Sequence, residues 1–192
     1  FDEVLLKDVN FEIKSTDKVA IVGANGAGKT TLFQTIFNNN NSSIEINENI
    51  KIGYLSQLQG QTLNYSNTIA DEFFDIGFKT YDDIKEYLEG YNFDEELLNQ
   101  KIGTLSGGEK NLIQLAKISE VGADLLLLDE PTSHLDTYSQ IALEKAIKNY
   151  KGAILMVSHD YYTIANCMDY VLFIENKKIR KININHFKAE SS

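Results

Sequence analysis

Residues 23–30 combine glycines, a lysine and a hydroxyl at the spacing G-x-x-x-x-G-K-T. The glycines allow the backbone to curl until successive N–H groups point at phosphate oxygens, with the positive end of the following helix behind them. Lys29 would reach the β- and γ-phosphate oxygens as a point charge, and the Thr30 hydroxyl would bind Mg²⁺. A chance match in a glycine-rich turn is the alternative, but the strand–loop–helix context favours a nucleoside triphosphate site. The residues expected around the phosphates are Gly23, Ala24, Asn25, Gly26, Ala27, Gly28, Lys29, Thr30 and Thr31.

Further polar residues follow apolar segments that read as strands. In parallel α/β sheets ligands gather at the carboxyl ends of the strands, so these residues should converge on the phosphate loop. Gln57 and Asp129 would join Thr30 around Mg²⁺, and the Gln57 amide would also reach the attacking water. Glu130 would act as the general base that takes a proton from that water. His159 would polarise or sense the γ-phosphate. Each residue alone could be an ordinary surface group; the ordered set favours phosphate chemistry.

Two further parts of the chain are candidates for contacts with a nucleotide. Ser106, Gly107 and Gly108 open a predicted helix and form a second anion-binding end, for which the chain offers no phosphate of its own. This suggests that they close over a nucleotide bound by a partner. Phe1 lies far enough upstream of the phosphate loop to stack on a nucleotide base, or it is an ordinary strand residue.

The elements that position these residues alternate along the chain. Residues 18–22, 125–128 and 153–157 read as buried strands, and 125–128 is a fully apolar run, as expected of a central parallel strand covered on both faces. Helices are predicted over 29–37, from the N-cap Ser106 to about 120, and over 137–148, where Asp136 would cap the first turn. Short helices are expected over 68–74, 80–89 and 94–100, and the last strand is expected over 179–184.

Composition restricts the function further. The 192 residues carry a net charge of −10, and the acids concentrate in 66–100, so this region is not expected to lie on RNA and no direct contact with DNA is expected. The single cysteine, Cys167, excludes an internal disulfide and a cysteine zinc site, which favours a cytoplasmic location. The longest apolar runs are too short to span a membrane. The chain begins with Phe1 inside an apparent strand, which suggests an excerpt of a longer protein.

The motifs, taken in order, resemble an ABC-type ATPase nucleotide-binding domain. They are the phosphate loop, Gln57, Leu-Ser-Gly-Gly-Glu at 105–109, Asp-Glu-Pro-Thr at 129–132, Leu135-Asp136 and Ser158-His159-Asp160. The resemblance covers essentially the whole chain. It implies a P-loop NTPase fold with a mostly parallel central sheet, N-terminal antiparallel strands and a small helical lobe. It also implies ATP hydrolysis in a head-to-tail dimer, with Asp136 in the loop that communicates across that dimer.

Within this superfamily the details resemble the ABC-F branch of soluble twin-domain proteins that act on ribosomes. The signature ends in Glu109-Lys110, and residues 129–136 read Asp-Glu-Pro-Thr-Ser-His-Leu-Asp, while Ser133, Leu112 and Tyr161 depart from the usual pattern. The resemblance implies a translation factor or a protein that protects ribosomes from antibiotics. The second nucleotide-binding domain would be a sibling domain or a second copy, and the ribosome would be contacted through parts outside this chain.

Two other classes compete with this interpretation. The ATPase subunit of an ABC membrane transporter would dock a membrane domain near Gln57, but residues 58–65 are polar and do not favour such a groove. A chromosome-maintenance module would need a long coiled coil between the phosphate loop and the signature, for which there is no room. We therefore expect one domain, with a core over 1–57 and 122–192 and a helical lobe with the signature over about 58–121.

Overall fold

The computed structural model describes residues 3–8, 10–24, 28–38, 44–56, 63–133, 135–176 and 178–191. By their internal contacts they form two compact units, each treated separately below. The first unit comprises residues 1–54, 123–131 and 150–192, and the second comprises 55–122 and 132–149. The predicted boundaries between core and lobe stay a prediction.

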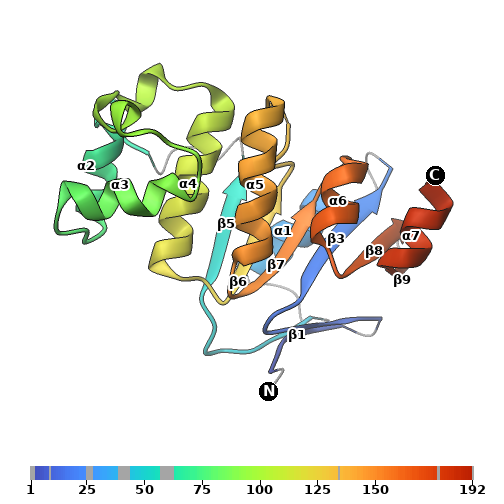
Figure 1. The fold of residues 1–192 in the computed structure, drawn as a ribbon. Helices are drawn as coiled ribbons and strands as arrows, with labels where there is room; N and C mark the ends of the chain where they lie inside the picture. The colour runs from blue at the N-terminus through green and yellow to red at the C-terminus, as the bar shows by residue number, and fades with distance from the viewer. Residues whose placement is uncertain are drawn as a thin grey trace. The chain divides into compact units, whose positions relative to one another are not determined.

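A six-stranded sheet forms the centre of the first unit, in the order β5-β6-β7-β3-β8-β9 (Figure 1). The pairs β6–β7, β7–β3 and β3–β8 are parallel, and β9 is antiparallel to β8. Every residue of β7 and the four leucines of β6 are buried, which confirms the predicted central parallel strands. The strands are β3 (Lys18–Gly23), β5 (Ile52–Ser56), β6 (Leu125–Asp129), β7 (Ala153–Val157), β8 (Tyr170–Glu175) and β9 (Lys178–Asn183).

A smaller antiparallel sheet, in the order β2-β1-β4, confirms the predicted N-terminal strands. Its strands are β1 (Val4–Lys7), β2 (Glu12–Lys14) and β4 (Glu45–Ile46). Leu6 and Ile13 from this sheet share one hydrophobic core with Phe33 of α1 (Lys29–Asn38) and with Leu127 and Leu155 of the large sheet. This common core fixes α1, and therefore the residue that begins it, against the strands.

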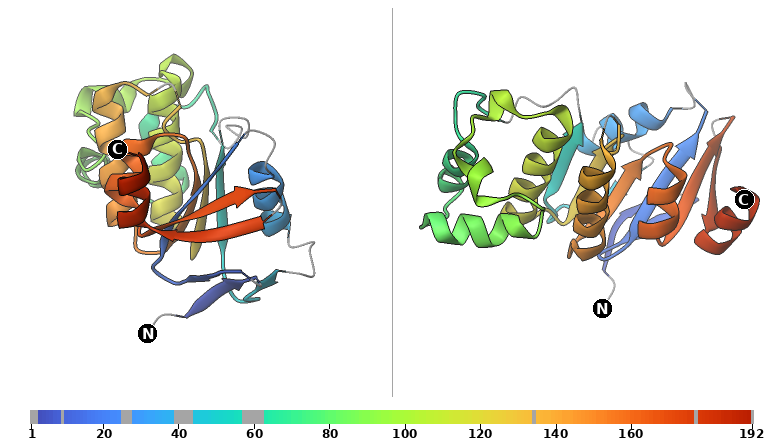
Figure 2. Two further views of the ribbon diagram at one scale, coloured as in Figure 1. Left: turned by 90° about the vertical axis from the view of Figure 1, so that its right-hand side faces the viewer. Right: turned by 45° about the horizontal axis from the view of Figure 1, so that its top comes forward.

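Helices cover both faces of the large sheet, with α1 on one face and α6 (Tyr161–Cys167) and α7 (Ile184–Ser191) on the other (Figure 2). Helix α7 corrects a prediction, because Ile184 was expected to end the last strand. The Asn183 side chain instead accepts a hydrogen bond from the backbone N–H of His186 at 2.8 Å, which satisfies one of the free donors of a helix start. The strand therefore ends at Asn183, one residue before the predicted end, and Ile184 begins the helix.

The second unit is helical, and the predicted cap at Ser106 is confirmed. Thr68, Thr80 and Ser106 each accept a hydrogen bond from the N–H three residues on. Phe73 and Phe93 are buried in its core, whereas Phe74 is 40 % exposed.

The segment expected as a helix over 94–100 is a 3₁₀ helix. The elements of the second unit are α2 (Ile69–Asp75), α3 (Tyr81–Glu89), η2 (Glu95–Asn99), η3 (Ile102–Thr104), α4 (Gly107–Val121) and α5 (Thr137–Asn149). None of the helices in the described ranges is both long and apolar enough to cross a membrane.

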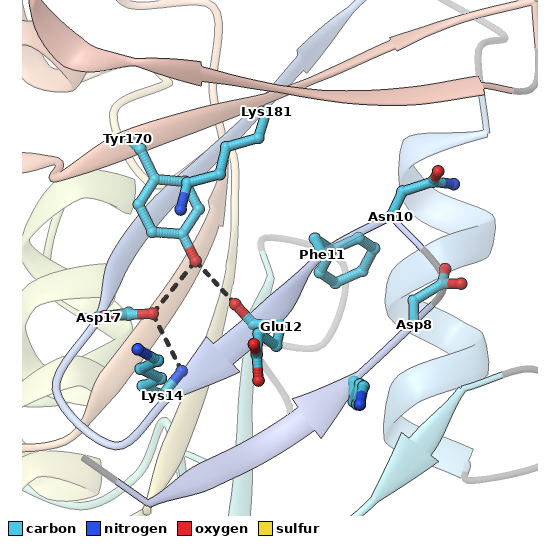
Figure 3. Close-up of a pocket in the computed structure, with 9 residues that line it drawn as sticks. Asp8, Asn10, Phe11, Glu12, Lys14, Asp17, Tyr170 and Lys181 are labelled. Carbon is cyan, nitrogen blue, oxygen red and sulfur yellow. Dashed lines mark hydrogen bonds between the residues drawn. The ribbon is translucent and has the colours of Figure 1, made fainter. Parts of the chain in front are cut away.

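A cavity of about 400 Å³ in the first unit contains none of the predicted site residues (Figure 3). The Tyr170 hydroxyl lies 3.0 Å from the Glu12 carbonyl oxygen and 3.1 Å from Asp17 Oδ2, and can donate its one proton to either. Asp17 Oδ2 also accepts from the Lys14 N–H at 3.0 Å. Burial, and then the Asp17 charge, raise the pKa of Tyr170, so it stays a neutral donor. These bonds tie β8 to β2 and to the turn before β3.

Replacement of Tyr170 by Phe is expected to lower the free energy of unfolding by about 1 kcal/mol, because two acceptors lose their shared donor. The midpoint of urea unfolding should fall while its slope stays unchanged. Tyr162, which is 72 % exposed, provides the matched control, and Tyr162→Phe should leave the midpoint unchanged. Equal effects of the two substitutions would contradict this role for Tyr170.

Candidate functional site

Lys29 is the first residue of α1, and its side chain is held inside the first unit. The residue is only 7 % exposed. Its Nζ donates a hydrogen bond to the Gly23 carbonyl oxygen at 2.8 Å and lies 3.2 Å from His159 Nε2. The ammonium group is therefore fixed between the end of β3 and His159, the second residue after β7.

Glu130 follows β6 directly, and His159 is the second residue after β7, the neighbouring parallel strand. Glu130 Oε1 lies 3.2 Å from His159 Nε2. The backbone of Glu130 has φ 50°, a left-handed conformation uncommon for a residue with a side chain, and its N–H donates to the Val157 carbonyl oxygen at 2.8 Å. The chain thus leaves the sheet abruptly at Glu130 while it remains bonded to β7.

The proton on His159 decides which of its two contacts is a hydrogen bond. When Nε2 carries no proton it accepts from the Lys29 ammonium, and when it is protonated it donates to the Glu130 carboxylate. One nitrogen cannot do both at once. The three side chains therefore form a cluster with two alternative proton arrangements.

Asp129 ends β6 and lies beside Tyr54 of β5. Burial raises the pKa of Asp129, while a hydrogen bond from the Tyr54 hydroxyl and the Lys29 charge lower it. Burial likewise raises the pKa of Glu130, which the His159 and Lys29 charges lower and the Asp129 charge raises. Burial, followed by the Asp129 charge, raises the pKa of Tyr54. The Lys29 charge thus acts on both partly buried carboxyl groups, alongside Tyr54 for Asp129 and His159 for Glu130.

The described part of the phosphate loop is consistent with an anion cradle. Gly28 has φ 100°, and no heavy atom lies within 4 Å of where its Cβ would be. Gly23 ends β3, Ala24 and Thr31 are exposed, and Thr30 lies in α1. The Thr30 side chain lies outside the described part of the structure, as do the predicted residues Phe1, Asn25, Gly26, Ala27 and Gln57.

A magnesium ion fits the described residues only in part. Asp129 is the one predicted metal ligand whose side chain is described, and its partly buried carboxylate is an oxygen donor of the kind that Mg²⁺ prefers. Within the described ranges, no group of three or more His, Cys, Asp or Glu residues could hold a metal ion. The Thr30 and Gln57 contributions therefore stay predictions.

The second unit carries the other predicted residues. The Ser106 side chain accepts from the Glu109 N–H at 3.1 Å, and Glu109 accepts in return from the Ser106 N–H at 2.9 Å. A Cβ on Gly108 would lie 2.3 Å from Leu135 Cδ2, whereas a Cβ on Gly107 would meet nothing within 4 Å. The exposed Asp136 accepts from the Ser139 N–H at 2.7 Å, which lowers its pKa and confirms its place at the start of α5.

Tyr54 is a site residue that the sequence interpretation missed. It contacts α1 through Phe33 and Phe37, with ring centroids 5.8 and 5.4 Å apart, and its hydroxyl bonds to Asp129. Tyr54 is the middle residue of β5, and its role depends on β6 lying beside that strand, which the sequence alone does not show. Aromatic residues in strands are common, and this one carried no motif.

The sequence is similar to those of known proteins. A family model described as "ABC transporter" matches residues 6–133. Over 91 % of the chain the sequence is 36 % identical to ABC transporter F family member 5 of Arabidopsis thaliana, and over 89 % it is 33 % identical to the energy-dependent translational throttle protein EttA of Escherichia coli. These matches span 26 % and 32 % of the two relatives, so the chain covers about a quarter to a third of their length.

Solved structures show the same fold. The structure of cbiO1 from Clostridium perfringens, part of the ABC transporter complex cbiONQ, superimposes with a TM-score of 0.75 at 24 % identity. The match covers 99 % of this chain and 90 % of that one. This likeness confirms the predicted P-loop NTPase fold with its mostly parallel sheet.

Replacement of Lys29 by Met is expected to raise the pKa of both Asp129 and Glu130, because the positive charge that favours their ionised forms is lost. Carbon NMR of the carboxyl groups, titrated without divalent ions, measures both midpoints. Lys178→Met, at an exposed position on β9, is the matched control and should move neither. Unchanged midpoints in Lys29→Met would refute the electrostatic link.

Proposed function

This chain belongs to the ABC family of ATPases, and from that premise we propose that it binds and hydrolyses ATP against a second nucleotide-binding domain, within an ABC-F protein that acts on the ribosome. The observation that carries the ATPase part is the cluster of Lys29, Glu130 and His159. Glu130 and His159 follow the neighbouring strands β6 and β7, Lys29 begins the helix after β3, and His159 lies 3.2 Å from each of the other two. A cation, a carboxylate and an imidazole at one sheet edge are what transfer of a phosphoryl group to water requires.

Each residue of the cluster has a distinct role in this proposal. Lys29 binds the β- and γ-phosphate oxygens and neutralises part of their charge. Glu130 orients the attacking water and accepts its proton, and the burial that raises its pKa makes it a stronger base than a free carboxylate. His159 holds Glu130 in place and contacts the γ-phosphate. Asp129, with Thr30 and Gln57, would hold Mg²⁺, which would supply further charge neutralisation when bound.

The start of α4 supports a second phosphate contact made in trans. The reciprocal bonds of Ser106 and Glu109 satisfy the N–H groups of those two residues, so the remaining free donors of the first turn are the amides of Gly107 and Gly108. Gly108 is explained by the packing of Leu135, but nothing within the described chain crowds Gly107. We infer that Gly107 leaves room for a phosphate held by the partner domain, and that Asp136 lies at the same interface.

The ribosomal role rests on the relatives. A protein named a translational throttle and an F family member match most of this chain, whereas the chain matches only a part of each. We therefore propose a cytoplasmic, translation-associated ATPase, acting as a translation factor or in protection of ribosomes from antibiotics. The second domain is a sibling in the same polypeptide or a second copy.

Replacement of Glu130 by Gln is expected to slow ATP turnover by roughly 10²–10⁴-fold while ATP binding is retained, because an amide cannot take the proton of the attacking water. Turnover is measured as phosphate release and binding by equilibrium titration with ATP. Glu175→Gln, the same change at the exposed end of β8, is the control and should turn over normally. Normal turnover in Glu130→Gln would exclude the proposed base.

The ribosomal role is tested with the same variant in the full-length protein. Glu130→Gln should pellet with ribosomes in ATP and not in ADP, because a trapped ATP state keeps the domains closed. Drug-protection assays would then separate a translation factor from a resistance protein. If the variant traps ATP and does not pellet, the ribosomal proposal fails, and the ATPase subunit of a membrane transporter becomes the alternative.

Ser106→Arg is expected to spare ATP binding and to abolish ATP-dependent closure, because a long cationic side chain would occupy the space for the partner's phosphate. Small-angle X-ray scattering of the full-length Glu130→Gln protein, with and without the added Ser106→Arg, measures closure for either kind of partner. Ser66→Arg, in an exposed loop of the same unit, is the control. Full closure with Ser106→Arg would argue against the trans contact.

A further inference from the structure

Helix α7 is attached to α6 by a stacked pair of aromatic rings. The rings of Phe187 in α7 and Tyr161 in α6 lie with centroids 5.6 Å apart and planes 24° from parallel. Both residues are partly buried. Stacked aromatic pairs stabilise a structure by more than the area they bury would give. This contact therefore favours one arrangement of the two helices over others. Figure 2 shows both helices on the same face of the large sheet.

Tyr161 is the first residue of α6, and the turn before it carries His159. Asp160 Oδ1 accepts from the Thr163 N–H at 3.1 Å, and the Asp160 N–H donates to the buried Ser158 Oγ at 3.0 Å. These bonds make the turn at 158–160 continuous with the first turn of α6. A shift of that first turn therefore shifts the backbone of His159.

The imidazole of His159 depends on this backbone for its direction. Its side chain is 56 % exposed, so neighbouring side chains confine it little. Its contacts with Lys29 and Glu130 are both 3.2 Å, near the outer limit of useful hydrogen bonds. A displacement of a few tenths of an ångström would lengthen both contacts.

We propose that Phe187 is a positioning residue for His159. Its ring holds Tyr161, and through Tyr161 the first turn of α6, in the position from which His159 Nε2 reaches both Lys29 and Glu130. The inference rests on the proposed function, since it uses the role given there to His159. It adds that α7 takes part in the chemistry through the turn at 158–160. Among the described contacts, α7 touches neither the phosphate loop nor Glu130.

A double-mutant cycle in the full-length protein tests the inference. We expect Phe187→Ala to lower kcat for ATP by on the order of tenfold with KM unchanged, because misplacement of a reacting group affects the chemical step. In a His159→Ala background the same substitution should have no further effect. Phe187→Tyr, which keeps the ring, should retain the wild-type kcat. Phe74→Ala removes an exposed ring in α2 of the second unit, and it should also leave kcat unchanged.

The outcomes separate this inference from the proposed function. An equal loss of kcat from Phe187→Ala with and without His159 would show a merely structural effect and overturn it, as would an unchanged kcat in Phe187→Ala. Phe187→Leu keeps the apolar contact without the ring and replaces the Ala variant if that protein does not fold. Wild-type turnover in His159→Ala would instead refute the role of His159 itself, and the inference with it.

Discussion

The order of three parallel strands is the constraint on which the candidate site depends. Asp129 at the end of β6 pairs with Val157 at the end of β7, and Val157 in turn pairs with Ile21 of β3. Segments that lie far apart in the sequence therefore end at one edge of the sheet, and the residues that follow them meet without any long loop. Every residue of β7 is buried, so the position of this edge is set by the hydrophobic core rather than by the polar residues that use it.

The polar cluster is costly to hold at that edge, and its parts compensate one another. Burial disfavours the ionised forms of both Asp129 and Glu130, and the charge of Lys29 favours them. Lys29 is itself almost fully buried, and its hydrogen bond to the Gly23 carbonyl satisfies it within the loop. The left-handed backbone of Glu130 is a further local strain of the kind often found at functional sites. These features together distinguish the cluster from an ordinary surface ion pair.

Sequence reasoning predicted most of the fold, and the reasons for its failures are specific. The central strands are continuous apolar runs, and the helices have Thr68, Thr80 and Ser106 at their starts, so local chemistry was sufficient there. Helix α7 was missed because its apolar residues continue the pattern of β9, and the deciding contact is one Asn183 side chain. Tyr54 and Phe187 were missed for a different reason. Their roles depend on which strand or helix lies beside them, and this is a property of the tertiary structure that spacing does not encode.

The two proton arrangements of His159 link these observations to nucleotide binding. In the structure the Lys29 ammonium is shared between the Gly23 carbonyl and Nε2. An anion that takes the ammonium removes the donor that favours an unprotonated Nε2. Nε2 can then carry a proton and donate a hydrogen bond to the Glu130 carboxylate, 3.2 Å away. Occupation of the phosphate loop would thus fix the orientation of the carboxylate through the histidine, and the cluster would respond to its ligand without any movement of the strands.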